Sequence, residues 1–147
     1  MTGERAEAPR FLPQPSPVSR PFWEAARRHE LVLQRCSGCE VHVFYPRYNC
    51  PHCGSRDLEW VKASGRAKVH SYTVARRPTH PAFADRVPYV IAIVELEEGP
   101  HMTTNIVDCD PDSVRIDMPV EASFEDVSDE ISLVMFRPVG LEELGSP

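Results

Sequence analysis

Apolar and polar residues alternate with a period of two from residue 65 onward, which is the period of a β-strand. Val120, Ala122 and Phe124, for example, alternate with glutamate and serine. Residues 89–94 are continuously apolar, so they predict a strand buried on both faces. A turn signal at 97–100 (Glu-Glu-Gly-Pro) joins the second and third strands as a hairpin. The alternation predicts strands over residues 66–76, 88–97, 102–108, 118–127 and 131–136.

The earlier part of the chain has a different pattern, beginning with a helix predicted over residues 20–30. Ser19 is positioned to cap this helix, and Pro21 falls in its first turn, where a missing N–H costs little. Phe22, Ala26 and His29 share one face, with Trp23 beside them. This face packs on the protein's own ribbon in one interpretation. In the other, Phe22 and Trp23 are anchors for a partner, as aromatic residues often are.

The pattern as a whole predicts a mainly β protein in four segments. Five strands in so short a stretch, with no helical pattern between them, are typical of a small closed barrel such as the five-stranded OB-fold. Prolines in the first 17 residues indicate a flexible or extended arm, on which apolar Phe11 and Leu12 could meet a partner. The predicted segments are this arm (1–17), a helix with a metal-binding ribbon (18–64), the barrel (65–138) and a tail (139–147).

Four cysteines form two Cys-x-x-Cys pairs, Cys36 with Cys39 and Cys50 with Cys53. Each pair can direct two sulfurs at one point, and two pairs together give the tetrahedral four-sulfur cage that zinc accepts. Iron also accepts this geometry, so the spacing alone leaves the metal open between the two. A site with four cysteines has no free coordination position, and we therefore expect a structural metal.

Charge and composition narrow the classes of function. Hydrophobic residues make up 41% and charged residues 26% of the 147 residues, which is typical of a soluble globular protein. No apolar run approaches the roughly 18 residues that a membrane helix needs. Residues 65–147 hold seven Lys and Arg against fifteen Asp and Glu, and this acidic surplus disfavours nucleic-acid binding. Paired cysteines that bind metal are typical of the cytoplasm, where we expect the protein.

No catalytic set is evident in the sequence. His70, His80 and His101 have no serine or cysteine at motif spacing, and Cys109 lies among carboxylates, which raise a thiol's pKa. A local basic stretch is the one candidate ligand site, since arginine and lysine can pair with the phosphates of a phosphorylated ligand. The alternative interpretation is a solvated strand face. The residues are Arg66, Lys68, Tyr72, Arg76 and Arg77.

An ordered set of motifs then resembles one known family. The set starts with Pro21-Phe22-Trp23, the cysteine pairs and Pro46-Arg47, and covers about residues 17–138. It continues with Val69-His70-Ser71-Tyr72-Thr73-Val74, Pro88-Tyr89-Val90, Val94 to Gly99, Met118-Pro119-Val120 and Phe136-Arg137-Pro138. These motifs resemble the zinc-ribbon OB-fold proteins of acyl-CoA metabolism. Two departures are Ala67 and Asp117, where the family often has glycine.

The resemblance implies an N-terminal helix, a rubredoxin-like zinc ribbon and a C-terminal OB barrel. It also implies an accessory subunit, without catalytic residues of its own, in a hetero-oligomer near the CoA moiety. The partner would be a thiolase-like enzyme, including aldolases of sterol side-chain breakdown, or a hotdog-fold enoyl-CoA hydratase. Two alternatives from other classes are a nucleic-acid-binding ribbon and OB module, and an independent enzyme acting on acyl-CoA.

Overall fold

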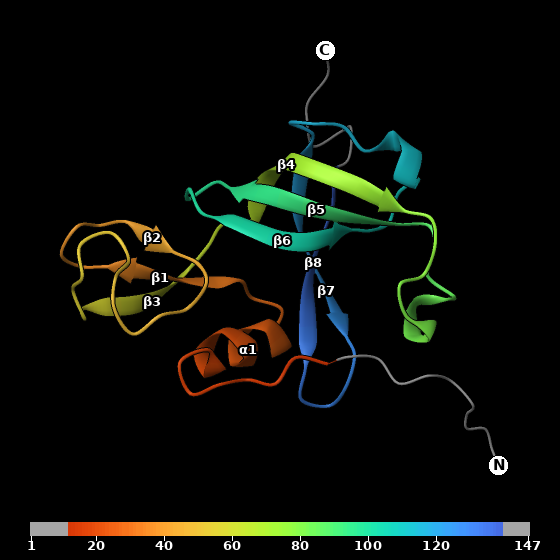
Figure 1. Ribbon diagram of the computed structural model, residues 1–147. Coiled ribbons are helices and arrows are strands. Elements are labelled where there is room, and N and C mark those ends of the chain that lie inside the picture. The colour runs from red at the N-terminus through yellow and green to blue at the C-terminus, as the bar shows by residue number, and fades with distance from the viewer. Residues whose placement is uncertain (1–11, 140–147) are drawn as a thin grey trace.

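The computed structural model describes residues 12–139 as one α-helix, two short 3-10 helices (Pro81–Phe83 and Pro111–Ser113), a three-stranded sheet and a closed five-stranded barrel (Figure 1). Predictions for residues 1–11 of the arm and 140–147 of the tail lie outside the described residues. The sheet has the order β2-β1-β3, with β1 (Val32–Cys36) between β2 (His42–Val43) and β3 (Leu58–Lys62). The barrel strands are β4 (Arg66–Ala75), β5 (Tyr89–Leu96), β6 (His101–Ile106), β7 (Pro119–Asp126) and β8 (Ser132–Pro138).

The barrel confirms the predicted mainly β fold, and each strand begins and ends within two residues of its predicted bounds. Strand order around the barrel is β4-β5-β6-β8-β7, and β5 and β6 form the predicted antiparallel hairpin. Closure depends on the parallel pair β6 and β8, which match at Ile106 and Phe136. Asp117 has a left-handed φ of 66°, the conformation that glycine adopts most easily, which accounts for a glycine in the family at this position.

Two details of the helix differ from the prediction. Helix α1 spans Arg20–Arg27, and its Ser19 side chain makes no cap hydrogen bond, since its Oγ accepts from the Ser16 N–H at 2.9 Å instead. His29 lies beyond the helix end, where its φ is 63°, and its ring stacks on Phe124 instead of sharing the helix's buried face. No helix in residues 12–139 is long and apolar enough to cross a membrane.

One apolar core joins the helix, the sheet and the barrel. Helix α1 packs against β1 and β8 (Figure 1). Phe22 of this helix contributes to the same buried cluster as Leu33 of β1 and Phe136 of β8. A second, smaller cluster lies at the far end of the sheet and contains Cys36, Val43 and Cys50. Strand β1 therefore connects the main core with the cysteine cluster.

The continuously apolar strand is buried on one face only, which corrects the prediction for residues 89–94. Along β5, Val90, Ala92 and Val94 are buried, whereas Ile91 and Ile93 remain 38% and 36% exposed. No helix or sheet of the described residues covers this outer face, because α1 and the ribbon sheet pack elsewhere on the barrel (Figure 1). The strand thus presents apolar side chains to both the core and the solvent.

Candidate functional site

The two cysteine loops have the same backbone geometry. In the first, the Glu40 N–H donates to the Cys36 carbonyl at 2.7 Å, and in the second the Gly54 N–H donates to the Cys50 carbonyl at 2.8 Å. The fifth residue of each loop is left-handed, with φ of 66° at Glu40 and 83° at Gly54. Gly54 adopts this conformation without the steric cost that Glu40 bears. The first loop leaves β1 at Cys36, and the second lies between β2 and β3.

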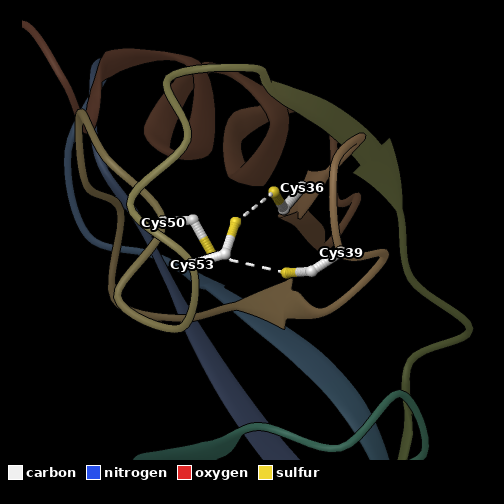
Figure 2. Close-up of side chains that lie close together, drawn as sticks. All are labelled: Cys36, Cys39, Cys50 and Cys53. Atoms are coloured by element: carbon white, nitrogen blue, oxygen red, sulfur yellow. Dashed lines mark hydrogen bonds between the residues drawn. The ribbon is translucent and has the colours of Figure 1, made fainter.

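The four sulfur atoms gather between these loops (Figure 2). Cys36 Sγ lies 3.5 Å from Cys53 Sγ, Cys39 Sγ lies 3.7 Å from Cys50 Sγ, and all four are within 4.8 Å of one another. A zinc–sulfur bond of about 2.3 Å implies sulfur–sulfur distances of about 3.8 Å in a tetrahedron. The arrangement fits a zinc ion held by two cysteines from each loop.

The surroundings lower the pKa of two of the four thiols and raise the pKa of the other two. The Cys39 backbone N–H, with further N–H and thiol donors, lowers the pKa of Cys36 to about 6, and the Cys53 N–H lowers that of Cys50. The Val41 N–H alone would lower the pKa of Cys39, but burial and the neighbouring sulfurs raise it to about 12. Four adjacent thiolates repel one another, and a divalent cation removes that repulsion.

Gln34 is a supporting residue that the sequence analysis did not single out. Its side chain is buried in β1, where Nε2 donates to the Arg47 carbonyl and Oε1 accepts from the Arg47 N–H, both at 2.8 Å. These bonds tie the segment before Cys50 to the central strand of the ribbon. The sequence does contain one signal of this role, because the polar Gln34 directly follows the apolar residues Leu31-Val32-Leu33. An amide that is buried with such neighbours requires hydrogen-bond partners.

A mainly apolar groove of about 450 Å³ lies between α1, the segment after β2 and the barrel. The predicted partner residues lie here in an edge-to-face pair, with ring centroids 5.0 Å apart. Phe22 is only 5% exposed and packs within the protein's own core, whereas Trp23 is half-buried in the groove wall. Other residues around the groove are Phe44, Tyr45, Met102, Asn105, Leu133 and Met135.

Tyr45 connects this groove with the exposed face of β5. Its hydroxyl donates to Thr103 Oγ1 at 3.3 Å, and Thr103 pairs in register with Ile93. Asn105 also lines the groove and pairs with Ile91. The groove and the outer faces of β5 and β6 are therefore one continuous surface, which we call the docking face; it comprises Trp23, Tyr45, Ile91, Ile93, Thr103 and Asn105.

The predicted basic stretch is not one cluster in the structure. Arg66 and Lys68 lie at the start of β4, and Arg76 and Arg77 lie just past its end, about 30 Å away at the usual rise of a strand. Acidic neighbours also offset two of the charges. Arg76 pairs with Asp112, and Lys68 Nζ lies 4.0 Å from both Glu95 and Asp117.

Tyr72 does not share a strand face with Lys68, because a bulge in β4 lies between the two residues. The β4–β5 register shifts between Val69 and Ser71, and beyond this bulge Tyr72 pairs with the inward-facing Ala92. Before the bulge, Lys68 pairs with Glu95. A CoA contact stays a prediction, and it concerns either end of β4 rather than all five residues together.

Comparison with known protein families finds a match for the ribbon and a match for the barrel. The family described as ChsH2, rubredoxin-like zinc ribbon domain, matches residues 23–59, and the family described as ChsH2, C-terminal OB-fold domain, matches residues 60–125. The predicted structural zinc and the OB-fold are thereby confirmed, since the matched ribbon brings its four cysteines together.

Two relatives and one solved structure extend the comparison. A DUF35 domain-containing scaffold protein of Methanothermobacter thermautotrophicus is 47% identical over 106 residues, which are 71% of this chain and 78% of that protein. A probable enoyl-CoA hydratase alpha subunit of Thermomonospora curvata is 46% identical over 83% of this chain, which spans only 38% of that protein's length. In a solved structure described as Ltp2-ChsH2(DUF35) aldolase, one chain is 43% identical with a TM-score of 0.77, covering 86% of this chain and 98% of that one.

Proposed function

Because this chain belongs to the DUF35 domain-containing scaffold proteins, we propose that it is a non-catalytic subunit of an acyl-CoA enzyme. Its partner is a thiolase-like or hotdog-fold protein that acts on acyl-CoA thioesters in the cytoplasm, and the two form a hetero-oligomer. The observation that carries this proposal is the structural match to one chain of an aldolase described as Ltp2-ChsH2(DUF35). The match covers 98% of that chain. The relative named as a hydratase alpha subunit supports the wider class of acyl-CoA enzymes.

The docking face is the surface that fits such a partner. Ile91 and Ile93 expose apolar side chains next to an apolar groove, and neighbouring apolar patches of this kind mark protein interfaces. Trp23 and Tyr45 add the two aromatic side chains that most often dominate binding energy. Phe22 supports this surface from the core, by its edge-to-face contact with Trp23.

Zinc contributes to this function through structure rather than chemistry. Tyr45 lies in the segment between Cys39 and Cys50, so the metal holds both ends of the segment that carries it. Gln34 fixes the same segment at Arg47. Four sulfurs leave no free coordination position for a substrate, so we assign the metal no role in bond making or breaking.

A contact with CoA is the less developed part of the proposal. Arg66 with Lys68, or Arg76 with Arg77, would pair with the phosphates of CoA held mainly by the partner. Replacing each pair by glutamine in the assembled complex distinguishes them: the pair in contact raises the KM for acyl-CoA and leaves assembly unchanged. Equal KM values in both double variants and the unchanged complex would contradict a phosphate contact at β4.

The experiment that tests the main proposal is isolation of the tagged protein from its native cells, followed by reconstitution. We expect a thiolase-like or hotdog-fold protein in stoichiometric amount, and acyl-CoA turnover that requires both proteins. Ile91→Glu and Ile93→Glu should each abolish assembly, because they put a charge into the apolar interface. Ile116→Glu is the matched control, since Ile116 is also exposed but lies outside the docking face.

Three outcomes would overturn the proposal. Recovery of nucleic acid with salt-sensitive binding would favour the nucleic-acid-binding module. Turnover of acyl-CoA by the purified chain alone would make it an independent enzyme. Normal assembly of both the Ile91→Glu and Ile93→Glu proteins would place the interface elsewhere and contradict the docking face.

A further inference from the structure

Three side chains of types that can bind a metal meet on the outer surface of the barrel, on strands that carry none of the four paired cysteines. His70 of β4, Glu95 of β5 and His101 of β6 each offer one ligand atom, and these atoms all lie within 4.8 Å of one another. The sequence gives no reason to expect His70 beside His101, since 31 positions separate them. Only the barrel makes them neighbours.

The barrel register explains this meeting. Glu95 and His101 are directly paired on β5 and β6, on the same outward face as Ile91 and Ile93. Strand β4 borders β5 on the other side, and His70 is the residue at its bulge between Val69 and Ser71. Strands two apart in a sheet are about 9.6 Å from each other, so the two imidazoles lean across β5 to meet.

The two histidine rings lie against each other. Their centroids lie 4.4 Å apart at 37°, and within residues 12–139 neither ring makes a hydrogen bond or an ion pair. Neutral imidazole nitrogen is a common ligand of divalent transition metals, and two histidines with one carboxylate form a known three-ligand set. Each histidine is exposed and Glu95 is half-buried, so a metal ion can reach them from solvent.

We propose that His70, Glu95 and His101 bind a divalent transition-metal ion of the zinc class, separate from the ribbon zinc. Ligand atoms around zinc at about 2.0–2.1 Å lie about 3.3 Å apart in a tetrahedron, so the side chains must close by at most about 1.5 Å. Rotation about the side-chain torsions of surface residues supplies such a movement. Three protein ligands leave at least one coordination position open to water or to a ligand from outside.

Among residues 12–139, Lys68 is the cation that competes for Glu95. Its Nζ lies 4.0 Å from Glu95 Oε1 and 4.0 Å from Asp117 Oδ1, which is the outer limit for an ion pair. Glu95 retains its second carboxylate oxygen for a metal, but the ammonium group repels the incoming cation. The site therefore predicts the sign of one substitution: removing the lysine charge tightens metal binding.

The test uses the full untagged chain with its ribbon zinc in place. Zn²⁺ is added in a calorimetric titration, and side-chain nitrogen NMR identifies the histidines that respond. We expect one further equivalent of zinc, with the imidazole signals of His70 and His101 shifting and that of His29 unchanged. Loss of one of three ligands should weaken binding at least tenfold, since even changes in residues behind the ligands cost about 10–100-fold.

The variants are His70→Gln, His101→Gln and Glu95→Gln for loss, and Lys68→Met for gain. His29→Gln is the matched control, because it removes an exposed histidine that pairs with Asp126 at 2.9 Å instead. Zinc content and circular dichroism confirm that each variant keeps its ribbon and its fold. Two results would overturn the site: no second equivalent at millimolar Zn²⁺, or a second equivalent that both histidine variants bind as tightly as the unchanged protein.

Discussion

The ribbon and the barrel are both built from short, mainly antiparallel strands, but they are stabilised differently. The cysteine end of the ribbon buries only Cys36, Val43 and Cys50, and its strand β2 has two residues. The barrel closes on itself around a buried cluster that includes Val69, Val94 and Phe136. Three short strands with so little apolar surface are marginal in water, so the metal provides the stability that the barrel obtains from its core.

Removal of the ribbon zinc should have the largest effect, because it should unfold the ribbon and leave the barrel folded. In a Cys36→Ser, Cys39→Ser protein, two sulfur ligands are lost, and folding that depends on a metal fails without it. In a ¹⁵N–¹H NMR spectrum we expect the dispersed signals of residues 32–62 to collapse and those of 66–138 to persist. Docking to the partner should be lost as well, because Tyr45 lies within the collapsed segment.

Persistence of the ribbon signals without metal would show that its small apolar cluster is sufficient. Collapse of the barrel signals together with those of the ribbon would show that the two regions fold as one unit. Unfolding of the ribbon could spread to the barrel in this second outcome, because Leu33 of β1 belongs to the main core.

Phe136→Ala tests the barrel side of the comparison. Phe136 is fully buried in β8, where it pairs with Ile106 of β6 to close the barrel, and a Phe→Ala change of this kind costs about 3–5 kcal/mol of unfolding free energy. Urea unfolding measures this loss. Metal analysis of the folded variant should still find one zinc, and a folded protein without zinc would mean that barrel packing holds the ribbon.

Gln34→Ala addresses the hydrogen bonds that support the metal loops. The substitution leaves the N–H and carbonyl of Arg47 without their buried partner, at a cost of about 1–3 kcal/mol. Zinc transfer to a chelator should become faster, because the segment before Cys50 is no longer tied to β1. Gln34→Met keeps the side-chain volume but not the hydrogen bonds, so it should release zinc nearly as fast as Gln34→Ala. Zinc release at the rate of the unchanged protein would show that Gln34 acts through packing rather than through its hydrogen bonds.

Thr104→Val has the smallest expected effect and concerns barrel closure. The Thr104 hydroxyl is buried and donates to the Val134 carbonyl at 2.9 Å, across the β6–β8 contact. Its loss should cost about 1 kcal/mol in urea unfolding. Thr103→Val on the exposed face of the same strand should stay within about 0.5 kcal/mol. Equal losses in the two variants would contradict a special role for Thr104 in closing the barrel.

The strands and the metal ligands could be predicted because their signals are local in the sequence. Alternation along each strand depends only on which face meets the core, and a Cys-x-x-Cys turn brings its two sulfurs together whatever surrounds it. Strand β3 (Leu58–Lys62) was not predicted, since its residues do not alternate regularly and it becomes a strand by pairing with β1. The role of Gln34 could not be predicted, because its partner Arg47 lies 13 positions away.

The sequence by itself determined the ribbon ligands, the positions of the five barrel strands along the chain, the β5–β6 hairpin and the family. Tertiary structure decided which strand faces stay uncovered, and it exposed Ile91 and Ile93 on a strand predicted to be buried on both faces. It also separated the basic residues along β4 and joined His70 with His101 across β5. The physical reason is that a strand's register and neighbours depend on how the barrel closes, and closure depends on contacts between residues far apart in the chain.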